Sequence, residues 1–67
     1  MNPTTQWEKM QVSAETAVHL RGTHQLWSRL IEGDHCFTVL LIGKEPGPND
    51  TGYASIKAAL QVKGMWS

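Results

Sequence analysis

The residues with the strongest coordinating or nucleophilic chemistry in this sequence are His19, His24, His35 and Cys36. A structural zinc site usually has paired ligands two to four residues apart on both sides of a loop, and no such pairing occurs here. Adjacent residues on a strand also point to opposite faces, which separates His35 from Cys36. We therefore expect surface histidines and no metal site.

Cys36 is the single cysteine of the chain, so an intrachain disulfide is impossible. A catalytic cysteine needs a nearby base and an environment that favours the thiolate. Cys36 instead begins an apolar segment, and free cysteine behaves as a small hydrophobic residue. The sequence predicts a buried core thiol that reacts slowly.

Two other patterns in the sequence also lack what a phosphate-binding or catalytic site requires. Gly43 and Lys44 differ from a phosphate loop, because that motif ends in Gly-Lys-Ser/Thr and leads directly into a helix, whereas Lys44 precedes Glu45 and Pro46. Most carboxylates lie in expected loops or near helix ends, and the chain is too short for a deep pocket. We expect no enzyme activity and no cofactor.

Composition sets the broad class. Sixty-seven residues form one small domain, and 40% hydrophobic with 18% charged residues is typical of a globular chain. The net charge of zero argues against a protein that mainly grips nucleic acid. The longest apolar run, Val39 to Ile42, cannot span a bilayer, and no secretory signal is visible. We expect a cytoplasmic protein that does not enter membranes.

The expected domain covers residues 1–67, with an arm or short helix over 1–11, a core over 12–62 and a tail over 63–67. Ser13 is a good N-cap for a helix over 14–21. A second, amphipathic helix is predicted to start after Thr23 and to stop at Gly33, with its apolar residues in two i,i+4 pairs. The alternative is a strand over 26–31 that turns at Gly33-Asp34 into a hairpin.

The second half of the chain is predicted as strand, loop and helix. The run 36–42 is rich in strand-forming residues and nearly continuous in apolar character, so both of its faces should be covered. Two prolines and two glycines prevent regular structure over 45–52. A closing helix over 53–62 is expected, with Asp50 or Thr51 as its cap. The predicted fold is a small α+β domain of helix-helix-strand-loop-helix order.

Three stretches of this pattern resemble one known family. They are Val12 to Gly22, then Leu26-Trp27-Ser28-Arg29-Leu30-Ile31-Glu32-Gly33, then Phe37 to Gly43, with the closing helix in the expected place. Together they cover about half the chain and are similar to the excisionase-type winged helix-turn-helix proteins. The sequence departs from that family in a shorter turn between the first two helices and in Glu45-Pro46-Gly47-Pro48 where the family has a basic wing.

The resemblance implies a small DNA-binding regulator of mobile-element type, as found in phages and plasmids. The second helix would lie in the major groove of double-stranded DNA, where arginine reads guanine and glutamine reads adenine. The residues implied to contact DNA are Arg21, His24, Gln25, Ser28, Arg29 and Lys44. The alternative for these residues is an ordinary solvated helix face. On either interpretation Arg29 is exposed, and Arg29→Ala is expected to leave folding intact.

A second hypothesis, from a different class, is a small phage-type inhibitor or adaptor that binds a host protein complex without catalysis. Exposed tryptophan is a frequent interface anchor, and the acidic stretch 32–50 could meet a basic partner. The candidate partner-binding residues are Trp7, Glu32, Asp34, Glu45, Asp50 and Trp66. Homodimerisation is compatible with both hypotheses and would help so small a core.

Overall fold

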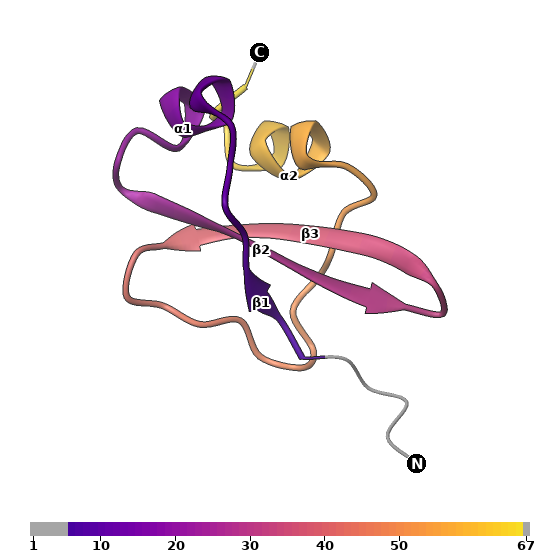
Figure 1. Ribbon diagram of the computed structural model, residues 1–67. Coiled ribbons are helices and arrows are strands. Elements are labelled where there is room, and N and C mark those ends of the chain that lie inside the picture. The colour runs from indigo at the N-terminus through magenta and orange to yellow at the C-terminus, as the bar shows by residue number, and fades with distance from the viewer. Residues whose placement is uncertain (1–5, 67) are drawn as a thin grey trace.

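The computed structural model describes residues 6–66, and it forms a three-layered α+β domain. The elements are β1 (Glu8–Lys9), α1 (Ala14–Leu20), β2 (His24–Ile31), β3 (Asp34–Leu41) and α2 (Ile56–Val62). The strands form one antiparallel sheet in the order β1-β2-β3. Both helices lie on one face of this sheet, and the loop 43–52 crosses the other (Figure 1). Residues 1–5 of the expected arm and Ser67 of the tail lie outside the described residues.

The predicted α+β class is confirmed, but the predicted order of elements is wrong. The chain runs β-α-β-β-α, so the helix-helix-strand arrangement of a winged helix does not form. None of the helices in residues 6–66 is long and apolar enough to cross a membrane.

The segment Leu26–Ile31 causes this difference, because it is a strand and the hairpin alternative is the one that occurs. Glu32 and Gly33 form a two-residue turn with φ of 53° and 85°, as a type I′ hairpin requires. This turn fixes the register from Ile31 opposite Asp34 to His24 opposite Leu41. Apolar residues spaced for a helix can equally alternate on a strand, and here the long-range pairing with β3 decides.

The two helices have the residue composition expected of them but differ at their ends. Ser13 caps α1 as predicted, with its hydroxyl accepting from the backbone N–H of Thr16 at 3.2 Å. The cap of α2 is Ser55, which accepts from the N–H of Ala58 at 3.0 Å, so the predicted caps Asp50 and Thr51 are wrong. Tyr53 cannot begin the helix because its N–H and C=O both pair with Phe37 at 2.8 Å.

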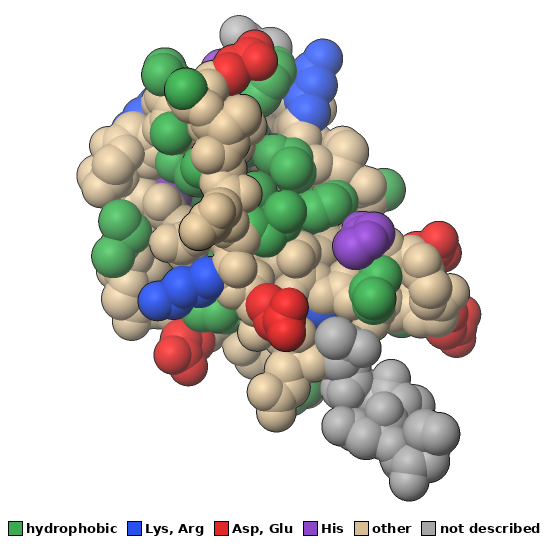
Figure 2. Space-filling view, in the orientation of Figure 1, with side chains coloured by type: hydrophobic (Ala, Val, Ile, Leu, Met, Phe, Trp, Pro, Cys, Tyr) green, Lys and Arg blue, Asp and Glu red, His purple; other side chains and the backbone are tan. Residues whose placement is uncertain are grey.

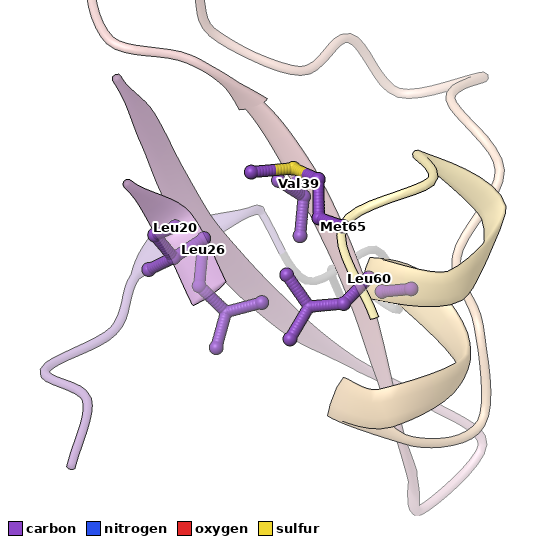
Figure 3. Close-up of a cluster of buried hydrophobic side chains, with 6 residues drawn as sticks. Leu20, Leu26, Val39, Leu60 and Met65 are labelled. Atoms are coloured by element: carbon purple, nitrogen blue, oxygen red, sulfur yellow. The ribbon is translucent and has the colours of Figure 1, made fainter. Parts of the chain in front are cut away.

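The main core lies between the sheet and the helices. Leu26 from β2, Val39 from β3 and Leu60 from α2 are fully buried and point toward one another (Figure 3). Met65 joins them from the chain after α2, so the expected tail contributes to the core. Leu26 and Val39 are cross-strand partners, which places both side chains on the helix-covered face.

The strand expected over 36–42 begins two residues earlier, at Asp34, and ends at Leu41. Its predicted coverage on both faces is wrong at the end of the run, where Leu41 and Ile42 are 52% and 62% exposed, and holds only in the middle of the strand. Thr38 and Val39 are adjacent and both buried, although they point to opposite faces. A pocket lies on the loop-covered face of the sheet.

Candidate functional site

The side chains on the face away from the helices come from all three strands. Because Leu26 faces the helices, its neighbour Trp27 faces the other way, together with Arg29 two residues later. Lys9 of β1 pairs with Trp27, and Trp7, two residues earlier, shares that face. Trp7 and Trp27 are only 9% and 6% exposed, so this face forms a second, smaller apolar layer.

The loop 43–52 is held against this face by hydrogen bonds from Trp7 and Arg29. The indole N–H of Trp7 donates to the carbonyl oxygen of Gly47 at 3.0 Å. The Arg29 guanidinium donates to the carbonyl oxygens of Pro48 at 3.1 Å and Asp50 at 3.5 Å. The same guanidinium lies over the Trp7 ring at 4.5 Å from its centroid, a cation–π contact. Arg29 therefore joins strand, loop and tryptophan.

The loop also stabilises its own shape and approaches the sheet closely. The carboxylate of Asp50 accepts from the backbone N–H of Gly47 at 2.6 Å, and the Asp50 N–H donates to the Gly47 carbonyl at 3.1 Å. At Gly52 a Cβ would lie 2.6 Å from the Cβ of Cys36 and 3.1 Å from the Trp7 ring. Only glycine allows this approach without displacement, so the sequence sets the height of the loop above the sheet.

A pocket of about 390 Å³ lies between the loop and the strands. Its lining consists of Gln6, Trp7, Trp27, Arg29, Glu45, Pro46 and Pro48. A smaller hollow of about 90 Å³ shares Trp27 and Glu45 with it and is lined further by Lys9, Gln25, Ile42, Gly43 and Lys44. We call the two together the loop groove. Apolar walls with a few polar groups are the usual composition of a binding site.

Two N–H donors at the loop groove lack acceptors. In the described part of the chain, the indole nitrogen of Trp27 and the Nε of Arg29 are buried without a hydrogen-bond partner. An unsatisfied buried donor costs about 1–3 kcal/mol, so native structures contain few of them. Both groups can only donate, so only an acceptor can satisfy them.

The residues that the family resemblance implied for DNA contact do not share one surface. Gln25 and Arg29 face the loop groove, whereas His24 and Ser28 alternate with them and point to the helix side of β2. Arg21 is the left-handed C-cap of α1, with φ of 61°. The predicted reading helix does not exist, since these residues lie on and around a strand. Gln25, Arg29 and Lys44 line the loop groove.

The residues expected to bind a protein partner are also divided. Trp7 and Glu45 line the groove, but Trp7 is buried rather than an exposed anchor. Asp50 is occupied in the loop turn, and the other two acids, Glu32 and Asp34, are at the exposed tip of the hairpin. Trp66 is half-buried and stacks on His19, with ring centroids 3.9 Å apart.

The histidines and the cysteine form no metal centre. Within residues 6–66, no three His, Cys, Asp or Glu side chains are grouped so that they could hold a metal ion. The expected surface position is wrong for His19 and His24, which are half-buried, and His19 is within hydrogen-bond distance of the Met65 carbonyl at 3.1 Å. Cys36 is half-buried rather than fully buried, because it lies under Gly52 at the margin of the second layer.

Sequence reasoning missed Lys9, Trp27, Pro46 and Pro48 as groove residues. The signal lay in the hairpin alternative, since an i,i+2 pattern over 25, 27 and 29 places three large side chains on one face of β2. Models of protein families, curated proteins and solved structures were all compared with this chain, and none matches. The case for a function therefore depends on the geometry of the loop groove.

Proposed function

We propose that this chain is a small, non-catalytic protein-binding domain whose loop groove takes an extended segment of a partner protein. The observation that carries the proposal is the pocket of about 390 Å³ between two largely buried tryptophans and the proline-containing loop. Aromatic and prolyl walls accept the side chains of an extended peptide at low entropic cost, because both are already rigid.

The charge distribution favours a protein partner over duplex DNA. The net charge is zero, and on the face drawn in Figure 2 basic and acidic side chains are interspersed around a central group of hydrophobic ones. Duplex binding draws most of its affinity from clustered cations against phosphates. Arg29, which the DNA hypothesis used for reading bases, donates instead to two backbone carbonyls.

The tryptophan faces also disfavour single-stranded nucleic acid. Base stacking requires a free aromatic face. The Arg29 guanidinium already covers Trp7, and the Lys9 ammonium lies 5.8 Å from the centroid of the Trp27 ring. Trp7 and Trp27 are also only 9% and 6% exposed, so neither offers a free ring face to a base.

Site-specific photo-crosslinking tests the proposal. A benzophenone amino acid replaces Gln6 at the groove, or Gln61 on α2 as the matched control, and the chain is irradiated in the cells that carry its gene. We expect a discrete protein adduct from position 6, unaffected by nuclease and absent from position 61. Adducts of equal yield at both positions, or duplex binding in a low-salt shift assay that is lost in Lys44→Gln, would contradict it.

A further inference from the structure

We infer that the loop groove selects an acidic partner segment, with a carboxylate seated in its smaller hollow beside Trp27, Lys9 and Lys44. This inference rests on the proposed function and adds the chemistry of the occupant. Its first basis is charge. Three cations, Lys9, Arg29 and Lys44, line the two hollows, against the single carboxylate of Glu45.

The second basis is the pair of unsatisfied donors. The Trp27 indole N–H and the Arg29 Nε both lack an acceptor; Trp27 lines the smaller hollow, whereas Arg29 lines the adjoining pocket of about 390 Å³. A carboxylate offers two oxygens with several lone pairs and no donor, so it complements N–H groups and ammonium groups together. A lysine side chain would present further donors to the same positions and would leave them unsatisfied.

The third basis is the size of the two hollows and the residues that surround them. The hollow of about 90 Å³ between Lys9 and Lys44 suits a small group such as a carboxylate, whereas the adjoining pocket of about 390 Å³ has room for the apolar residues that flank it. The Gln25 amide nitrogen donates to the carbonyl oxygens of Met10 and Leu26, which fixes this wall of the hollow. Glu45 lines both hollows, so its own charge opposes an anionic occupant.

The test uses three blocked peptides of five residues, with glutamate, glutamine or lysine flanked on each side by two prolines. Each is titrated into the ¹⁵N-labelled chain, and the indole N–H signals of the tryptophans are followed. We expect the glutamate peptide to shift the Trp27 signal downfield in a saturable manner that weakens with added salt, while the Trp66 signal stays in place. The glutamine and lysine peptides should bind at least several-fold more weakly.

Charge variants provide the second arm. Glu45→Gln should tighten binding of the glutamate peptide by about two- to five-fold, and Lys44→Gln should weaken it by a similar factor, as for partly exposed charge pairs. Lys63→Gln on the far layer changes the net charge equally and should have no effect.

The outcomes distinguish the acidic preference of the groove from the proposed binding of a partner segment. Equal binding of the glutamate and glutamine peptides at Trp27 would overturn the acidic preference and leave the groove as a peptide site. Binding of no peptide at Trp27, or equal shifts at Trp66, would overturn the carboxylate subsite, while the crosslink from position 6 would still decide the proposed function.

Discussion

Arg29 illustrates how far the role of one residue depends on the element that carries it. On a helix it would project into solvent, and its removal would leave folding intact. On β2 its guanidinium contacts the Trp7 ring and donates to two loop carbonyls. The same charge therefore stabilises the loop and also contributes to the electrostatics of the groove.

We predict that Arg29→Lys lowers the free energy of unfolding by about 1 kcal/mol, because lysine lacks the planar fork that reaches two carbonyls and stacks on the ring. Urea unfolding followed by tryptophan fluorescence measures this. Arg21→Lys, at an exposed position, is the control and should change it by less than about 0.5 kcal/mol. If both variants change the free energy of unfolding by the same small amount, the Arg29 side chain lies in solvent.

At Gly52 we predict that alanine destabilises the protein, in contrast to the usual effect of replacing a glycine. Gly52→Ala should destabilise by about 1–3 kcal/mol, because the new methyl group would meet the Cβ of Cys36 at 2.6 Å and has no room to move. In Gly47→Ala the nearest atom is the Asp50 carboxylate at 4.0 Å, so that variant should retain stability in the same unfolding assay. If both variants are equally stable, the loop does not lie against Cys36.

At the scale of elements, the α2 cap separates the observed helix from the predicted one. Ser55→Ala should cost about 0.5–2 kcal/mol because it removes the acceptor for the Ala58 N–H. Thr51→Ala should cost little, since Thr51 is exposed and lies outside the helix. Thermal unfolding by circular dichroism compares them, and a larger loss at position 51 would mean that the helix begins earlier.

The hairpin turn gives a second prediction at this scale. Glu32 has a φ of 53°, a conformation that asparagine adopts more readily. Glu32→Asn should therefore stabilise by about 0.5 kcal/mol or more, and Gly33→Ala, at a φ of 85°, should destabilise. If the two substitutions acted in the same direction, the turn would not be of the type I′ geometry.

The sequence predicted α1 and its cap because those signals are local: Ser13, a good N-cap, stands directly before helix-forming residues. It could not decide the state of 26–31, since six residues with this apolar spacing fit both periods and the pairing with β3 is a tertiary effect. Trp7 and the loop 43–52 form the groove only when the hairpin exists. Most of the candidate site could therefore not be predicted once residues 26–31 were interpreted as a helix.

The whole molecule combines a main core under the helices with a smaller layer under the loop. The first contains the fully buried aliphatic residues, and the second consists mainly of Trp7, Trp27 and Thr38. A domain of this size has little stability to spare. The loop is nevertheless held in place by Arg29, Trp7 and Gly52, while two donors beside it stay unsatisfied. We interpret this arrangement as a face that is shaped for an occupant.

The measurement that tests the central claim most directly is a map of backbone amide and indole shifts when the purified partner segment, identified by crosslinking, is added to the labelled chain. We predict that the largest changes occur at residues 6–9, 25–29 and 44–48, including the Trp27 indole N–H. The largest changes on α1 and α2 instead, around the exposed Val18 and Val62, would contradict the account and place the binding surface on the helical face.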